Sequence, residues 1–281
     1  MSIFERYQAR YESSREEVMS LDEYLELCKQ DPSAYAGPGE RLLMAIGEPE
    51  LLDTRNDPRL SRIFQNKVLK RYPAFSEFYG MEEPIEHLVS YLKHAAQGLE
   101  EKKQILYLLG PVGGGKSSLA EKLKELMEKI PFYAIEGSPV FESPLGLFSP
   151  EEDGPILEDD YGIPARHLRA TMSPWAVKRL QEYNGDITQF RVVKLHPSIL
   201  EQVAIAKTEP GDENNQDISS LVGKVDIRQL ERFAQHDADA YSYSGALCRA
   251  NQGLMEFVEM FKAPIKVLHP LLTATQEGNY N

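Results

Sequence analysis

The feature that most restricts the fold of this chain is a glycine-rich octapeptide, Gly110–Ser117, which reads Gly-Pro-Val-Gly-Gly-Gly-Lys-Ser. An apolar run (105–109) precedes it, and apolar residues at helical spacing follow it between 119 and 127. Glycine tolerates positive φ, so such a loop can turn several N–H groups inward, and the start of the next helix adds partial positive charge. The sequence therefore predicts a buried strand, a phosphate-binding loop and a helix in succession.

The motif gives the polar residues of this loop distinct chemical roles. Lys116 is expected to neutralise the β- and γ-phosphates of a nucleoside triphosphate, and the Ser117 hydroxyl is expected to be a Mg²⁺ ligand. A chance glycine-rich turn would match the same motif, but the strand before it and the helix after it favour the phosphate site. We expect ATP and Mg²⁺ as cofactors. The loop residues predicted to hold them are Gly110, Pro111, Val112, Gly113, Gly114, Gly115, Lys116, Ser117 and Ser118.

A P-loop enzyme also needs carboxylates on a second strand, one to position the metal and one to polarise the attacking water. The best candidate is Gly253–Met260, which resembles the Walker B strand of AAA+ ATPases, with Glu259 at the position of the catalytic glutamate. The preceding aspartate position holds Val258, so either Glu256 helps to hold the metal or hydrolysis is weak. An amphipathic helix over the same residues is the alternative. The predicted catalytic residues are Lys116 and Glu259, and the predicted metal ligands are Ser117 and Glu259.

The rest of the pattern describes an α/β protein. Apolar residues at helical spacing predict an amphipathic helix over 82–97, and the short apolar run 132–135 predicts a second strand. We expect residues 76–281 to form a P-loop NTPase core of AAA+ type, a parallel sheet flanked by helices, with an insertion at about 150–245. Residues 1–75 are polar with helical patches, and predict a helical N-terminal extension.

Composition argues against several classes of protein. The chain has 44 Asp and Glu residues against 31 Lys and Arg residues, a formal charge of −13, which disfavours a broad nucleic-acid-binding face. Its two cysteines, Cys28 and Cys248, cannot build a disulfide framework. The N-terminus lacks the apolar core of a signal peptide, and no stretch approaches the roughly 20 apolar residues that span a bilayer. We expect a cytoplasmic protein with no membrane or nucleic-acid partner.

Longer stretches resemble one family of AAA+ proteins. Residues Tyr91–Ser118, Ala206–Ile218 and Gly245–Gly253 are similar to the bacterial PrkA family, the so-called serine protein kinases (YeaG-like). The resemblance covers nearly the whole chain and implies an N-terminal AAA+ ATPase domain, attached to a kinase-like region and acting in stress signalling. It also places residues 78–82 where the AAA+ backbone wraps around adenine, although an ordinary core role is the alternative. The residues that this implies for adenine contact are Phe78, Tyr79, Gly80 and Met81.

PrkA proteins are much longer than 281 residues. The resemblance therefore implies that this chain stops before the sensor 1 strand, the arginine finger and the helical lid. An arginine finger contributes about 10³–10⁵ in rate, so we expect ATP binding with low turnover. The nucleotide sites of AAA+ proteins are completed by a neighbouring subunit, so the family also implies a homo-oligomer formed through the AAA+ core.

Three functions stay open at this point. The first is an AAA+ ATPase module that drives or regulates an attached effector region. The second is a P-loop phosphotransferase that modifies protein serine. The third is a non-hydrolysing module for nucleotide sensing and assembly, which Val258 motivates. The chain contains no His-Arg-Asp, Asp-Phe-Gly or Ala-Pro-Glu motif, so nothing in it supports eukaryotic protein-kinase chemistry, and the protein substrate is not fixed.

Overall fold

The computed structural model describes residues 2–5, 17–98, 104–111, 113–168, 172–209 and 218–277. The chain forms two compact units, and the sequence of the second is inserted into that of the first. Unit 1 comprises Met1–Ala36 and Pro131–Leu272, and unit 2 comprises Gly37–Ile130 and Thr273–Asn281. Across the described residues, no helix combines the length and the apolar character needed to cross a membrane.

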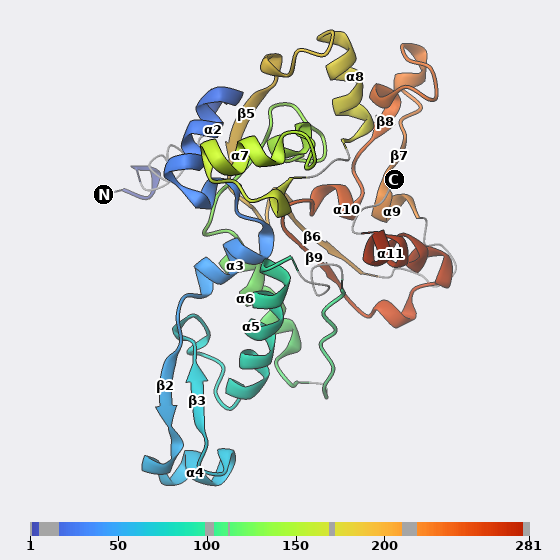
Figure 1. Ribbon diagram of the computed structural model, residues 1–281. Coiled ribbons are helices and arrows are strands. Elements are labelled where there is room, and N and C mark those ends of the chain that lie inside the picture. Colours follow the sequence, from blue (N-terminus) through green and yellow to red (C-terminus); the bar gives the residue numbers. More distant parts are fainter. Residues whose placement is uncertain are drawn as a thin grey trace. The chain divides into compact units, whose positions relative to one another are not determined.

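Unit 1 contains a three-stranded sheet in the order β1–β5–β4, whose central strand β5 is labelled in Figure 1. Both pairings are antiparallel, with Met19 opposite Val192 and Ala134 opposite Val193. The predicted strand at 132–135 is therefore confirmed as β4, but the prediction of a parallel sheet is wrong for this sheet. The three strands are β1 (Glu17–Ser20), β4 (Phe132–Ile135) and β5 (Arg191–Leu195).

Helix α2, in the N-terminal part of unit 1, packs against this sheet. It begins at a capping box in which the Ser20 hydroxyl accepts from the Glu23 N–H at 3.2 Å and the Glu23 carboxylate accepts from the Ser20 N–H at 2.7 Å. Tyr24 and Cys28 on its inner face are buried in one cluster with Tyr133 of β4. The helices of this part are α2 (Leu21–Gln30), α7 (Gly154–Tyr161) and α8 (Pro174–Glu182).

A second pair of strands in unit 1, β6 (Ile205–Thr208) and β9 (Leu254–Phe257), is the one parallel pairing among the described strands. The strand interpretation of Gly253–Met260 is thus confirmed over β9, and the alternative of an amphipathic helix is excluded there. Helices α9, α10 and α11 share a buried cluster with this pair, and β7 pairs with β8. These elements are α9 (Ser219–Val222), β7 (Lys224–Val225), β8 (Tyr241–Ser242), α10 (Ala246–Arg249) and α11 (Ile265–Glu277), which continues across the boundary between the units.

Unit 2 is built on three helices, of which α3 packs against both α5 and α6. The predicted helix over 82–97 is confirmed as α5, whose apolar stripe is buried at Ile85, Leu88, Val89 and Leu92. The helix predicted after the glycine-rich loop is confirmed as α6. Their bounds are α3 (Pro38–Ile46), α5 (Glu82–Ala96) and α6 (Lys116–Met127).

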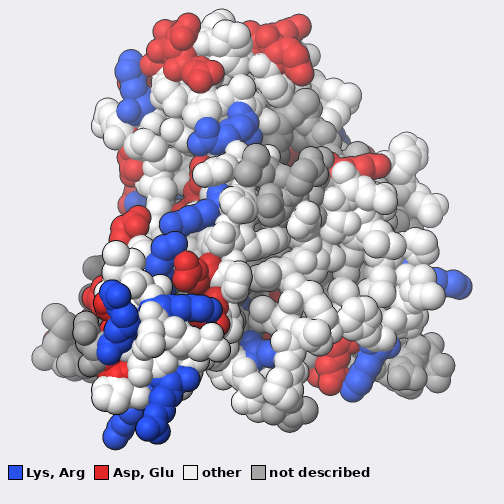
Figure 2. Space-filling view, turned by 60° about the horizontal axis from the view of Figure 1, so that its bottom comes forward, with Lys and Arg blue, Asp and Glu red and all other residues white. Residues whose placement is uncertain are grey.

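A segment that we call the arm, Glu50–Tyr72, belongs to the same unit. It contains an antiparallel hairpin with α4 between its strands, and it lies at the bottom of Figure 1. Figure 2 brings this part forward and shows Lys and Arg side chains gathered on it. The helical patches of residues 1–75 therefore alternate with strands. The elements of the arm are β2 (Glu50–Asp53), α4 (Pro58–Phe64) and β3 (Val68–Arg71).

The run 105–109 does not form the buried strand that its sequence predicts. It has no regular secondary structure, and Leu109 is 84% exposed while Tyr107 is 51% exposed. A parallel strand exists only where a neighbouring strand supplies hydrogen bonds. In unit 2, the described strands β2 and β3 pair with each other, so apolar character alone did not make this run a strand.

Candidate functional site

The glycine-rich loop has the backbone shape that an anion site needs. Gly113 and Gly115 both adopt φ +77°, which favours glycine because a side chain would be strained there. The Gly114 N–H donates to Pro111 O at 3.1 Å, and α6 begins directly after Gly115. The free N–H groups at the start of α6 and its dipole favour negative charge at this end. The loop can therefore receive a phosphate group.

Lys116 folds back over this loop. Its Nζ donates to Gly110 O at 2.7 Å and to Pro111 O at 2.7 Å. The ammonium therefore stays at the loop, where phosphate oxygens can replace the two carbonyl acceptors. Ser117 and Ser118 follow in the first turn of α6, and both are exposed. Val112, which is also predicted to hold the nucleotide, lies outside the described residues.

The segment before α5 contacts this loop. Met81 is the residue at the start of α5, and its Sδ would lie 3.1 Å from a Cβ at Gly115. Gly80 adopts φ +77° with open space around it, which turns the chain between Tyr79 and Met81. The structure thus brings Gly80 and Met81, two residues predicted to surround adenine, to the phosphate loop.

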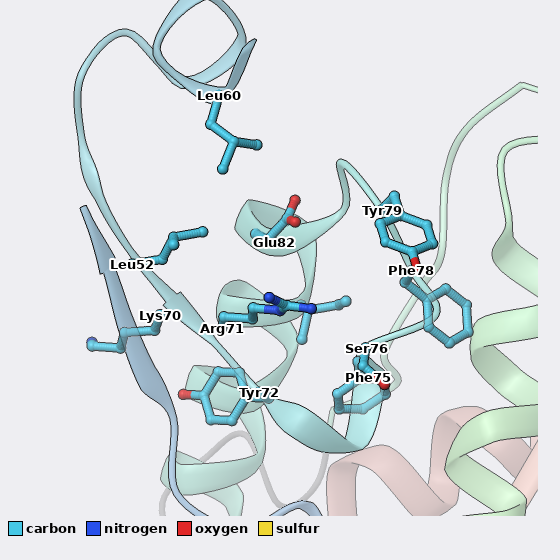
Figure 3. Close-up of a pocket in the computed structure, with 11 residues that line it drawn as sticks. Leu52, Leu60, Lys70, Arg71, Tyr72, Phe75, Ser76, Phe78, Tyr79 and Glu82 are labelled. Atoms are coloured by element: carbon cyan, nitrogen blue, oxygen red, sulfur yellow. The ribbon is translucent and has the colours of Figure 1, made fainter. Parts of the chain in front are cut away.

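Next to this turn is a pocket under the arm (Figure 3). Phe75, Phe78 and Tyr79 supply aromatic surface, and Tyr79 is 86% exposed. Of the residues in the pocket, Arg71 lies outside the predicted segment 78–82, and Glu82 ends that segment but was not predicted to contact the base. The Glu82 Oε2 atom is buried and has no hydrogen-bond partner among the described residues. The pocket thus combines ring surface with the Glu82 carboxylate and the Arg71 guanidinium.

The predicted acidic partner lies in unit 1. Glu256 is in β9, opposite Lys207 of β6, and the Val258 N–H extends the pairing by donating to Thr208 O at 2.9 Å. Glu259 follows in a left-handed conformation, with φ +50°, and its carboxylate pairs with Lys262 at 2.8 Å. Glu259 is thus at the end of a strand, as the Walker B comparison predicts, on an exposed turn.

Side-chain amides fix the start of β9, and the motif search missed them. Gln252 Nε2 donates to Phe141 O at 2.6 Å and to Tyr133 O at 3.0 Å, while Asn251 Nδ2 donates to Val140 O at 2.7 Å. Both amides therefore bind the turn after β4. The dipeptide Asn251-Gln252 before a glycine is a turn signal. It indicates a turn at this position but does not indicate which carbonyl groups the two amides bind.

The candidate site residues are thus divided between the units. The loop, Gly80 and Met81 lie together in unit 2, and Glu256 and Glu259 lie in unit 1. The joint action of Lys116 and Glu259 stays a prediction, as does the metal site of Ser117 and Glu259.

Comparison with known proteins gives a consistent result. The PrkA AAA domain family matches residues 19–281. A protein of Escherichia coli (strain K12), named serine/threonine kinase YeaG, is 71% identical over 100% of this chain and 44% of its own length. A protein of Bacillus subtilis (strain 168), named ATP-dependent protease PrkA, is 35% identical over 96% of this chain and 43% of its own length. This chain spans under half the length of these curated relatives. No solved structure matches it.

Proposed function

The chain belongs to the PrkA AAA domain family, and on that premise we propose that it binds ATP with Mg²⁺ at Gly110–Ser117. The observation that carries the proposal is the geometry of this loop. Gly113 and Gly115 share φ +77° immediately before α6, and Lys116 is held over the same loop by two carbonyl oxygens. A nest of N–H groups, a helix start and an ammonium are complementary to a polyphosphate.

The residues of the loop fit this ligand. Lys116 would exchange its carbonyl acceptors for phosphate oxygens, and the Ser117 hydroxyl is the candidate metal ligand in the first turn of α6. When bound, Mg²⁺ neutralises charge on the phosphates. The base would lie beside Gly80 and Met81, with Tyr79 and the pocket under the arm next to it. Ser118 completes the loop side of the site.

For the activity of the module, we infer that ATP binding and hydrolysis drive or regulate an attached effector region in stress signalling. The matched relatives are named a kinase and an ATP-dependent protease, which have an ATP-dependent role in common. Glu259, at the end of β9, is the candidate to polarise water. We further propose a homo-oligomer formed through the AAA+ core, and a cytoplasmic location.

A second function is favoured by one observation on the same turn. The Glu259 carboxylate is engaged by Lys262 at 2.8 Å, and the preceding position holds Val258 in place of a metal-binding aspartate. A module built this way can bind the nucleotide and report its presence without hydrolysing it. Direct transfer of phosphate to protein serine is the remaining alternative.

Titration with Mg²⁺ and ATP tests the binding site. Lys116→Ala should weaken ATP binding at least about tenfold, because a charge-assisted contact to phosphate is lost. Lys129→Ala is the matched control, since Lys129 is an exposed lysine just beyond the other end of α6. Equal ATP affinity of the Lys116 variant and the wild type would exclude this site.

Incubation with γ-labelled ATP then separates the three activities. Free labelled phosphate supports an ATPase, label on protein supports a phosphotransferase, and binding without turnover supports the sensing module.

A further inference from the structure

The arm differs in charge from the chain that carries it. Between Glu50 and Tyr72 there are six Lys or Arg residues and three Asp or Glu residues, whereas the whole chain has a formal charge of −13. Figure 2 shows these basic side chains at the surface of the arm. A basic projection on an acidic protein attracts an acidic surface.

Part of this positive charge is already compensated inside unit 2. The compensated pairs are Arg55 with Asp53 at 2.7 Å, Lys67 with Glu83 at 3.0 Å and Lys70 with Glu86 at 3.0 Å. Arg59 and Arg62 of α4 take part in no ion pair within the part of the chain that the structure describes, and both are exposed. The described ion pairs do not include Arg71 of β3 either, so two of the three basic residues of the arm outside these pairs lie on α4.

The shape of α4 places this charge around an apolar residue. Asp57 caps the helix by accepting from the Arg59 N–H at 2.8 Å. Arg59, Arg62 and Ile63 are three and four residues apart, so they share one helical face, while Phe64 is buried on the other side. Ile63 is 62% exposed. The outer face of α4 thus presents two arginines beside an exposed isoleucine.

Helix α7 in unit 1 presents the opposite charge, also beside an exposed isoleucine. Residues 151–160 contain six carboxylates and no basic residue. Ile156 is 58% exposed, and Asp159 and Asp160 lie three and four residues after it on the same face. Among the ion pairs of the described residues, none includes Asp159 or Asp160. Within the described residues, this face therefore offers two carboxylates outside any ion pair beside an exposed isoleucine.

We propose that α4 of one copy of this chain docks on α7 of a second copy. Arg59 and Arg62 pair with Asp159 and Asp160 of the other copy, and the two exposed isoleucines, Ile63 and Ile156, cover each other. Charge complementarity selects the second copy as the occupant, because each copy carries both surfaces. Two copies that exchange arms form a closed dimer with two such contacts, whereas head-to-tail docking continues into a ring or a filament.

This inference goes beyond the proposed nucleotide-binding function and does not depend on it. The contact uses no residue of the loop Gly110–Ser117, and Lys116→Ala should therefore leave self-association unchanged. Two short helices bury little area, so one contact is weak and several contacts in a closed ring are needed for a stable assembly.

The test is the mass of the 281-residue chain in solution, measured over a range of concentrations without nucleotide. The wild type should self-associate, and association should weaken as salt rises from about 0.05 M to about 0.5 M. Charge reversal in Arg59→Glu with Arg62→Glu, or in Asp159→Lys with Asp160→Lys, should weaken self-association at least about tenfold. A mixture of the two reversed chains should associate again, because acidic arms then meet basic α7 surfaces.

Two matched controls carry the same changes in charge elsewhere. Arg228→Glu with Arg232→Glu, and Asp22→Lys with Glu26→Lys, alter exposed residues outside the arm and α7 and should leave association unchanged. Circular dichroism verifies that each variant is folded, and the salt dependence of the wild type tests the proposal without any variant. A wild type that stays monomeric, an association insensitive to salt and to both reversals, or a mixture that fails to associate would overturn the proposal. Association that requires added nucleic acid would do the same.

Discussion

The sulfur of Met81 lies against Gly115 of the phosphate loop, so closely that a Cβ at Gly115 would be 3.1 Å from it. Gly115 also has φ +77°, a conformation that strains any other residue. The contact joins the turn before α5 to the loop before α6. The position of the loop therefore depends on a packing contact as well as on its own glycines.

We expect Gly115→Ala to weaken ATP binding at least about tenfold, because positive φ costs about 1–2 kcal/mol and the new methyl group displaces Met81. Calorimetric titration with ATP and Mg²⁺ measures the affinity. Gly162→Ala is the control, since Gly162 has φ +70° and nothing within 4 Å of its Cβ position. Strain alone should lower the melting temperature of both variants. Loss of ATP affinity in both, or in neither, would contradict a specific role for the Gly115 contact.

Glu259→Gln should lower ATP hydrolysis about 10²-fold or more and leave ATP binding nearly unchanged, because the substitution removes a candidate general base from an exposed turn. Single-turnover release of labelled phosphate measures the effect. Glu256→Gln, which changes the other candidate carboxylate three residues earlier in β9, is the comparison. Hydrolysis lost in the Glu256 variant and kept in the Glu259 variant would assign the catalytic role to Glu256.

Gly253→Ala should destabilise the parallel pair β6–β9. A Cβ at this position would lie 1.6 Å from Ala204 O, and the backbone must move to relieve this overlap. We expect a loss of about 1–3 kcal/mol or more in the free energy of unfolding, read from urea denaturation. Gly154→Ala is the control in the same unit, because its Cβ would meet side chains at 3.6 Å and 3.7 Å, which is ordinary contact. Equal stability of the two variants would contradict the packing of Gly253.

His196 should make stability depend on pH. Burial and, to a lesser extent, Lys194 lower the pKa of His196, against an opposing effect of Glu17. Its Nδ1 is buried without a hydrogen-bond partner among the described residues. Below about pH 6.5, the unfolded chain therefore binds a proton that the folded chain resists, and the free energy of unfolding falls as pH falls.

Urea denaturation at about pH 7.5 and about pH 5.5 tests this sign, since the interval brackets the ordinary pKa of histidine. The wild type should lose more stability over this interval than His196→Gln, which has no imidazole to titrate. His236→Gln, at an exposed histidine, should follow the wild type. Parallel losses in the wild type and the His196 variant would contradict the assignment.

Local patterns predicted the local elements of this fold. The spacing of Ile85, Leu88 and Leu92 gave α5 nearly to the residue, and the run before Lys116 gave the start of α6. In these cases the hydrogen bonds lie within one segment, so the sequence of that segment contains the information. The positive φ of Gly113 and Gly115 in the glycine-rich loop was predictable from that segment as well.

Pairing between distant segments was not predictable. The apolar run 105–109 contains no information about whether another strand lies beside it. In the structure, this run is not a strand. The hairpin of β2 and β3 was equally hidden, because two four-residue strands such as Glu50–Asp53 give too few positions for an alternating pattern. Arg71 enters the candidate site through this hairpin, so motifs alone did not reveal it.

The pairing of β1 with β5 has a consequence for the order in which the chain folds during translation. Glu17 and Lys194, which face each other in this sheet, are 177 positions apart in the sequence. Closing so long a loop costs entropy, and folds with high contact order form slowly. The sheet of unit 1 cannot form until the ribosome has released β5. The described helices α3, α5 and α6 of unit 2 leave the ribosome well before β5. The part of unit 2 that spans Gly37–Ile130 can thus acquire its structure while the first residues of unit 1 remain without their partner strand.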